Sequence, residues 1–418
     1  MKIIKTTLAF PLFFVLLLLF GCGGGGGGDN PASGLSGTST EPQVAARGTN
    51  QYVQVWVQED STTYRVYVSF YSGVSWGTPV SIGSIAKVSG GISSPQIVAD
   101  ASGDVVVVWM QGPFFTESIY ANHYDSGSGI WGGAELLEAS ADAAEDPQVA
   151  ADGSGNFIAI WTQSDGAIYR LYASRFASAT GNWTPSGAID AGTGEVGVEP
   201  QIASDGNGHF MAVWNELDGG NDDLNACRYS GGWGAVTTVN PGLGEGASPQ
   251  VASSAGGDEF MVVWKETNDI YANRFVGAAW AGAGQISGGA VSISPQVAGD
   301  GNSHFVAAWD EAGNNIWGRH FSAGWEAPEE LNSSSGLGSV PQVASSGTDN
   351  FTVTWLESDD VYYNRYDATV SDWSGEDLVN DGLGGALTPQ VAGDNSGGNG
   401  DFMIVWEQDD SIESRKFE

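Results

Sequence analysis

The chain has 418 residues, with 14 Lys and Arg against 50 Asp and Glu, and a formal net charge of -36. This acidity excludes nucleic acid and anionic lipid headgroups as expected partners, because both would repel the protein. Basic ligands or divalent cations fit better. Hydrophobic residues make up 41% of the chain, which favours a packed core over disorder.

The first 21 residues have the layout of a secretory signal peptide. Lys2 and Lys5 precede an apolar run from Leu8 to Phe20, which is too short for an ordinary membrane span. The segment ends in Leu-Phe-Gly-Cys, which resembles the lipobox of bacterial lipoproteins. The resemblance implies that Cys22 is the first mature residue, that it is acylated, for example with palmitate, and that it anchors the protein in the bacterial cell envelope. Gly23, rather than Asp, after the cysteine favours the outer membrane, on its periplasmic or its cell-surface side.

Residues 22–41 are expected to form a tether. Six consecutive glycines, Gly23 to Gly28, begin this segment, and no hydrophobic pattern follows them. Gly-rich chains behave as flexible coils. The folded body is therefore predicted to stand clear of the bilayer.

A Pro-Gln pair recurs eight times along the remainder of the chain, at intervals of 46 to 53 residues. Each pair opens one scheme: Val or Ile with Ala, a Gly-rich turn, Phe-x-Val-x-Trp, a second turn, a run like Ile-Tyr-Ala-Asn-Arg-Phe, and Gly-x-Trp. A period of this length with four short strand-like runs predicts β-propeller blades over residues 42–418. The repeats begin at Pro42, Pro95, Pro147, Pro200, Pro249, Pro295, Pro341 and Pro389.

The runs of one repeat read as consecutive strands. Pro147 to Ala151 has small residues suited to the innermost strand, and its proline stands where no ladder donor is needed. The turn from Asp152 to Asn156 leads to Phe157–Trp161, whose continuous apolar character indicates a strand covered on both faces. Outside the signal segment we expect no helix. No window of about a dozen residues both lacks Gly and Pro and shows an apolar stripe with helical period.

The strand count predicts eight blades. The first three strands occur in eight copies and the Trp-led fourth in seven, one strand fewer than the 32 that eight four-stranded blades need. The last blade is expected either to stay three-stranded or to be closed by residues 33–39. Closure matters because a lone blade leaves its faces and edges exposed.

Fifteen of the 16 tryptophans fall on two repeat positions. Buried aromatic rings contribute large apolar areas, so these residues are predicted to pack the blades. They are Trp56, Trp109, Trp161, Trp214, Trp264, Trp309, Trp355 and Trp406 on the second strand, and Trp76, Trp131, Trp183, Trp233, Trp280, Trp325 and Trp373 on the fourth.

The repeated sequence motif resembles that of uncharacterised bacterial surface lipoproteins with tandem β-propeller repeats. It is more loosely similar to NHL-type, sialidase-type and lectin propellers. The sialidase Asp-box is not met, because the turn after Ser204 lacks its spacing. The resemblance implies a scaffold and leaves the chemistry open.

Two polar positions also repeat. A Gln or Glu follows the second-strand Trp by two residues, and seven of eight third strands carry a basic residue at their penultimate motif position. One interpretation is structural: ion pairs between strands or blades, with Arg lying on Trp. The other is a set of glycan sites like those of fungal fucose-binding propellers. The candidates are Trp161, Gln163, Arg175, Trp214, Glu216, Arg228, Trp264, Glu266, Arg274, Trp355, Glu357 and Arg365.

Calcium is the only cofactor that the sequence suggests. Asp218, Asp222 and Asp223 cluster in one Gly-rich loop, and Asp394 and Asp401 in another; carboxylates on loops suit calcium, although neither loop has the EF-hand spacing. No zinc or copper centre is expected, because the histidines lack ligand spacing; His209 and His304, at turn ends, are expected to be exposed. The four histidines of the chain are His123, His209, His304 and His320.

We therefore expect a monomeric, lipid-anchored binding platform rather than an enzyme, with a glycan or an envelope protein as its ligand. A scaffold for outer-membrane protein assembly is one alternative, and a sialidase-like glycan hydrolase or lyase is another. No nucleophile motif is present, since Gly-x-Ser-x-Gly occurs only in degenerate form around Gly127. Cys227 is expected to be an inert buried thiol.

The lipidation hypothesis makes a direct prediction. Cys22→Ser should move the protein from the membrane fraction to the soluble fraction, because the acyl chains that anchor it would be absent. Fractionation followed by immunoblotting measures this. Retention of the variant in membranes would refute the lipid anchor.

Overall fold

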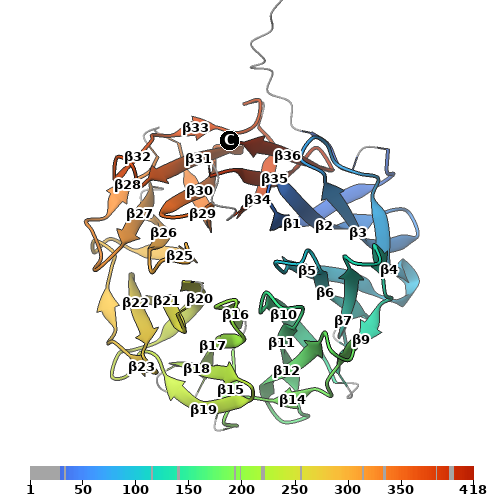
Figure 1. The fold of residues 1–418 in the computed structure, drawn as a ribbon, viewed down its shortest axis with the longest axis horizontal. Helices are drawn as coiled ribbons and strands as arrows, with labels where there is room; N and C mark the ends of the chain where they lie inside the picture. The colour runs from blue at the N-terminus through green and yellow to red at the C-terminus, as the bar shows by residue number, and fades with distance from the viewer. Residues whose placement is uncertain are drawn as a thin grey trace, which may run out of the picture.

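Eight antiparallel sheets follow one another around a central axis (Figure 1). The computed structural model describes residues 29–418 apart from 33, 114–115, 139–141, 193, 198, 218–221, 255–256, 313–314, 333–335, 383 and 395–399. The predicted signal peptide and Cys22 lie outside these residues. The prediction of an all-β, eight-bladed propeller is confirmed, and no helix in the described residues is long and apolar enough to cross a membrane.

Each of the first four blades places its first strand innermost and its last strand outermost. Blade 1 is β1 (Thr38–Gly48), β2 (Gln51–Glu59), β3 (Thr63–Tyr71) and β4 (Val80–Ala86), followed by a 3-10 turn at Lys87–Ser89. Blade 2 is β5 (Gly91–Ala99), β6 (Val105–Gly112), β7 (Ser118–Asp125), β8 (Ile130–Trp131) and β9 (Glu135–Leu136). Blade 3 is β10 (Ala144–Ala151), β11 (Phe157–Ser164), β12 (Tyr169–Ala177), β13 (Asn182–Trp183) and β14 (Gly187–Ala188). Blade 4 is β15 (Glu195–Val196), β16 (Gln201–Ser204), β17 (His209–Leu217), β18 (Asp223–Ser230) and β19 (Trp233–Thr238).

The other four blades continue the ring in the same direction. Blade 5 is β20 (Gly246–Ser254), β21 (Glu259–Glu266), β22 (Asp269–Val276), β23 (Ala279–Trp280) and β24 (Gly284–Gln285). Blade 6 is β25 (Ser292–Gly299), β26 (Phe305–Glu311), β27 (Asn315–Phe321) and β28 (Glu329–Glu330). Blade 7 is β29 (Gly338–Ser345), β30 (Asn350–Glu357), β31 (Asp360–Asp367), β32 (Asp372–Trp373) and β33 (Asp377–Leu378). Blade 8 is β34 (Ala386–Gly393), β35 (Phe402–Gln408) and β36 (Ser411–Phe417).

The outermost strand is less regular than the sequence scheme suggests. In blades 2, 3, 5 and 7 it is divided into two short pieces that both pair with the third strand, such as β13 and β14 against β12. Trp76 and Trp325 instead make isolated bridges to Tyr71 and Phe321. Edge strands broken in this way offer little template for pairing with another chain.

The ring closes between blade 8 and the start of the chain. Asp29 exchanges two main-chain hydrogen bonds with Ser414 of β36, at 2.8 and 3.0 Å. Ala32 is only 4% exposed and packs with Trp56 and Ile412. Blade 8 is therefore three-stranded, and the segment from Asp29 onward lies against its outer edge. The described residues begin at Asp29, well before Pro42.

The apolar core lies between blades rather than within them. One cluster combines Ile160 of blade 3 with Trp214 of blade 4, and all eight second-strand tryptophans are essentially inaccessible. In five blades the Trp ring faces a third-strand Tyr, as for Trp161 and Tyr172, whose ring centroids are 6.4 Å apart. The predicted packing role of the second-strand tryptophans is confirmed.

Trp264→Ala should destabilise the protein by about 3–5 kcal/mol, because a fully buried ring between blades 4 and 5 is replaced by a cavity. Denaturant unfolding measures the change. Trp280→Ala, in the same blade but only half-buried, is the matched control and should cost clearly less. Equal effects of the two substitutions would contradict the packing role.

The closure between blade 8 and the N-terminal segment buries an ionisable group. Burial raises the pKa of the Glu413 carboxyl from 4.5 to about 7, and Asp29 and other carboxylates add to the shift, against a hydrogen bond from Asn30 that lowers it. A carboxyl group whose pKa is raised by folding stabilises the fold in its protonated form. Its contribution is full below pH 4.5 and is lost as the pH rises through about 7.

Glu413→Gln should therefore remove a part of the decrease in stability between pH 4.5 and about 7. Urea unfolding across this interval compares the variant with the natural chain. The variant should be the more stable of the two above pH 7. An unchanged pH profile would show that the closure does not depend on this proton.

Candidate functional site

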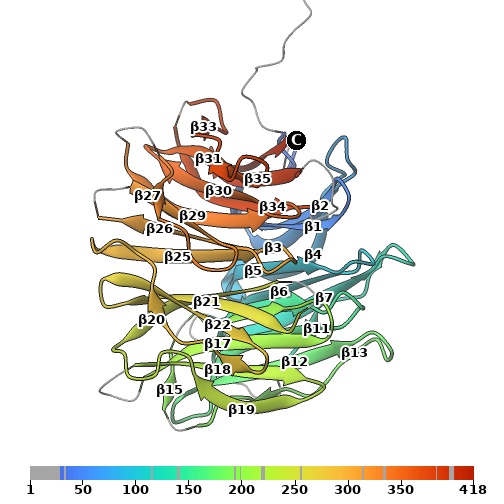
Figure 2. The ribbon, with the colours of Figure 1, turned by 60° about the vertical axis from the view of Figure 1, so that its left-hand side comes forward.

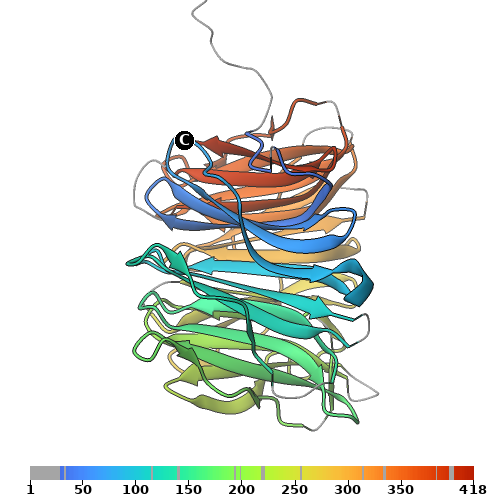
Figure 3. The same ribbon diagram turned by 90° about the vertical axis from the view of Figure 1, so that its right-hand side faces the viewer.

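The strands of every blade cross the ring from one face to the other, as the side views show (Figure 2, Figure 3). One face carries the hairpins between the first and second strands, such as residues 152–156, and is called the hairpin face below. The opposite end of the same strands, where Ala144 pairs with Gln163, is called the proline face, because the Pro-Gln pairs lie towards it. Third strands end at the hairpin face, because Phe157 pairs with Phe176.

In six blades the repeated Gln or Glu accepts a hydrogen bond from the buried tryptophan two residues before it, whereas the indole nitrogens of Trp214 and Trp309 have no such partner. The indole Nε1 of Trp161 donates to Gln163 at 3.1 Å, and that of Trp264 donates to Glu266 at 2.9 Å. Trp355 bonds Glu357 in the same way, and Glu357 also accepts from Asn332 of the preceding blade. This contact differs from the ion pair that the structural interpretation expected: the Gln or Glu accepts the buried indole N–H, which needs an acceptor.

The candidate Trp, Gln and Arg of one blade do not form one site. Gln163 pairs with Arg170 across the strands, whereas Arg175 pairs with Ile158. Five strand positions correspond to about 16 Å, so the Trp161–Gln163 pair and Arg175 lie towards opposite faces of the ring. The same register separates Glu216 from Arg228, Glu266 from Arg274 and Glu357 from Arg365. The expectation that Arg lies on these tryptophans is wrong: Arg274 and Arg365 lie over Phe321 and Phe402, within 5.4 and 5.0 Å of the ring centroids.

The basic position of the third strand faces the next blade. Arg228 of blade 4 makes a bidentate pair with Asp258 of blade 5, at 2.6 and 2.7 Å. Arg365 of blade 7 donates to the Gly400 carbonyl of blade 8 at 3.0 Å. These contacts link neighbouring blades, as the structural interpretation predicts.

Sequence reasoning missed the position before the basic residue. Asn122, Asn273 and Asn364 each donate to a main-chain carbonyl of the preceding blade, at 2.8 to 3.1 Å. The recurrence of Asn at one repeat position is the signal that could have revealed them. A third strand thus contacts both neighbouring blades through successive side chains, because strand side chains alternate in direction.

A groove between blades 3 and 4 has the features of a ligand site. Its volume is about 280 Å³, and it is lined by Arg175 and Thr184 of blade 3 and by Tyr229 and Trp233 of blade 4. Tyr229 and Trp233 meet edge to face, with ring centroids 5.4 Å apart. Arg175 is half-buried, and its guanidinium makes no hydrogen bond or ion pair with any residue that the structure describes. The groove therefore offers free donors beside two aromatic rings.

In the equivalent groove between blades 5 and 6, the arginine is already paired with other residues of the protein. Arg274, Phe321 and Trp325 line a space of about 220 Å³. Arg274, however, forms an ion pair with Glu259 and lies over Phe321. In other blades an aromatic or imidazole ring takes the place of Arg: Phe70 packs on Tyr124, and His123 packs on Phe176.

The innermost strands line a polar space at one end of the central axis. Towards the proline face, Gln96, Gln148 and Gln201 are among the residues around a space of about 350 Å³. The residue before each repeat proline has a positive φ of 45 to 64°, including the β-branched Val340 and Thr388. A positive φ at a residue other than glycine is a strained conformation. Here it marks a β-bulge, which contacts with neighbouring residues must stabilise. Ser94 N–H, for example, donates to Glu41 of the preceding blade at 2.5 Å.

Of the five predicted calcium residues, Asp394 and Asp401 are engaged by other residues of the propeller and Asp218 lies outside the described residues. Asp394 accepts the Asn50 N–H of blade 1 at 2.7 Å, and Asp401 pairs with Lys416 at 2.8 Å. Residues 395–399 and Asp218 lie outside the described residues, while Asp222 and Asp223 are half-buried near β18. Cys227 is buried, its pKa is raised to about 11 by burial, and its thiol bonds the Gly234 carbonyl.

Comparisons with known proteins give the fold and no family. No protein-family model matches the chain, and no curated protein matches its sequence. A prolyl endopeptidase structure is similar over 89% of this chain and 55% of its own, at 12% identity and a TM-score of 0.52. The fucose-binding lectin of Aleuria aurantia covers 70% of this chain and 96% of its own, at 14% identity and a TM-score of 0.41. A Hadza microbial sialidase covers 85% and 73%, at 11% identity and a TM-score of 0.47.

Proposed function

We propose that the protein is an envelope-anchored binding platform that holds a glycan in the groove between blades 3 and 4. The free guanidinium of Arg175 carries this proposal. A buried or half-buried charge without a partner is costly, so a ligand oxygen that it can bond gains affinity. The planar fork suits two neighbouring hydroxyls of a sugar, or a sugar carboxylate.

The aromatic wall complements the arginine. Tyr229 and Trp233 present flat apolar surfaces next to polar tips, and the C–H face of a sugar ring packs on such a surface while its hydroxyls meet the arginine. A space of about 280 Å³ lies near the lower end of ligand sites. It suits one sugar unit at a chain end.

Asp29, where the described chain begins, and the groove lie on opposite sides of the ring. Asp29 is held on blade 8, whereas blades 3 and 4 lie across the axis from it (Figure 1). If Cys22 is lipidated, Gly23 to Gly28 remain as the free tether, a span of roughly 15 Å for a flexible Gly-rich chain. The edge of blade 8 would then be near the bilayer and the groove would point away from it.

The proposal is tested on a broad glycan array with the natural protein and Arg175→Ala. We expect saturable binding that Arg175→Ala weakens roughly 10- to 100-fold, because a charge-assisted hydrogen bond contributes about 1.5–3 kcal/mol. The array also separates neutral sugars, read through their hydroxyls, from acidic ones, read through a carboxylate.

Arg228→Ala is the matched control. It removes the same side chain from the next blade, but there the guanidinium is bound to Asp258. This variant should lower the melting temperature and keep glycan binding, whereas Arg175→Ala should keep the melting temperature. A blank array, or undiminished binding by Arg175→Ala, would refute the groove as a glycan site.

A further inference from the structure

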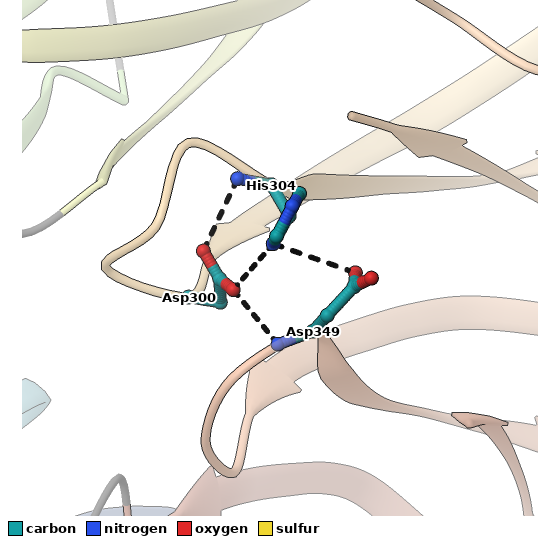
Figure 4. A group of neighbouring side chains, drawn as sticks. All are labelled: Asp300, His304 and Asp349. Atoms are coloured by element: carbon teal, nitrogen blue, oxygen red, sulfur yellow. Dashed lines mark hydrogen bonds and ion pairs between the residues drawn. The ribbon is translucent and has the colours of Figure 1, made fainter. Parts of the chain in front are cut away.

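Two carboxylates and an imidazole meet at the hairpin face between blades 6 and 7 (Figure 4). Asp300 and His304 come from the hairpin that joins β25 and β26, and Asp349 immediately precedes β30. One ligand atom from each of the three side chains lies within 4.8 Å of the others. This cluster is separate from the groove of blades 3 and 4.

The main chain holds the cluster in place. The Asp300 carboxylate accepts the N–H groups of Asn302 and His304, at 2.6 and 3.1 Å, and its second oxygen accepts the N–H of Asp349 across the blade boundary at 2.7 Å. His304 Nδ1 lies 2.7 Å from that oxygen and 3.7 Å from an oxygen of Asp349. The three groups therefore converge before any ligand is bound.

A second histidine, His320 of blade 6, contacts the carboxylate of Asp349. His320 is only 3% exposed, stacks on Tyr366 at 4.2 Å, and places Nε2 2.6 Å from the Asp349 carboxylate. Its Nδ1 faces Glu326 at 3.1 Å. In the described part of the chain no Lys or Arg forms an ion pair with Asp300, Asp349 or Glu326; Arg319 donates to the main-chain oxygens of Glu326 and Ile286. Three carboxylates thus share two imidazoles.

The chain contains an internal comparison for this cluster. Asp205, His209 and Asp258 occupy the equivalent positions between blades 4 and 5, with His209 Nδ1 2.7 Å from Asp205 and 4.0 Å from Asp258. There, Arg228 stands where blade 6 has His320, and it neutralises Asp258 through a bidentate pair. The two clusters differ chiefly in this residue: Arg228 pairs with Asp258, whereas His320 contacts Asp349.

We infer that Asp300, His304 and Asp349 bind a divalent transition-metal ion of the zinc class across the boundary of blades 6 and 7. Imidazole nitrogen with carboxylate oxygen is a ligand set that suits zinc. The ligand atoms would be Nδ1 of His304 and one carboxylate oxygen each of Asp300 and Asp349. His320 would orient Asp349, as partners of metal ligands commonly do. The expectation from sequence that no zinc centre exists rested on spacing along the chain, which cannot show ligands from two blades.

Zinc chloride titration of the purified, chelator-treated protein tests this inference. We expect about one tightly bound ion per chain and a rise in melting temperature, and we expect His304→Gln to weaken the binding on the order of 100-fold. His209→Gln, the matched change in the Arg-neutralised cluster, should leave zinc binding intact. Melting curves recorded without metal establish that both variants fold.

Asp349→Asn provides a second variant, because it removes the ligand oxygen charge while keeping the N–H that bonds Asp300. It too should weaken zinc binding. The inference is overturned if the natural protein binds no zinc saturably, if His304→Gln binds as well as the natural protein, or if both histidine variants lose binding equally. Equal affinity for calcium would overturn the assignment to the zinc class.

Discussion

A single blade of this protein cannot bury its own faces. The second strands, such as Phe157–Ser164, are apolar on both sides, so each sheet needs a neighbour on each side. The core clusters accordingly contain residues from adjacent blades, as with Ile160 and Trp214. This requirement leads to a closed ring, and it gives the contact of Asp29 with Ser414 its importance, since an open boundary would expose the side of blade 8.

The same requirement explains most of the repeated polar residues. Between tightly packed sheets every buried donor and acceptor needs a partner, and Asn273, Glu266 and Arg228 meet that need across blade boundaries or beside a buried indole. Repeats in which one of these polar residues lacks its usual partner are therefore candidates for ligand sites. Arg175 lacks the carboxylate that Arg228 has, and Asp349 has a histidine where Asp258 has an arginine. The proposed glycan groove and the inferred metal site are these two exceptions.

The blades and the burial of Trp264 could be predicted from the repeats, because residues that recur with one period occupy one environment. The grouping of Trp161, Gln163 and Arg175 could not, since it depends on the antiparallel register that places Gln163 opposite Arg170. The Asn that recurs at the position before Arg274 could be seen in the repeats, but its role could not, because its partner is a main-chain carbonyl of the preceding blade. The aromatic rings that line the groove with Arg175, Tyr229 and Trp233, belong to the next repeat.

The sequence alone determined the number of blades, the order of their strands and the residues that pack them, because these follow from periodic burial along the chain. Tertiary structure decided which repeated residues meet, because the sites lie between blades and combine residues about one repeat apart. His304 and Asp349 stand 45 residues apart along the chain, and Arg175 and Trp233 are similarly distant. Only the ring brings them together, by placing the hairpins of neighbouring blades side by side and the third strand of one blade next to the outer strand of the following blade.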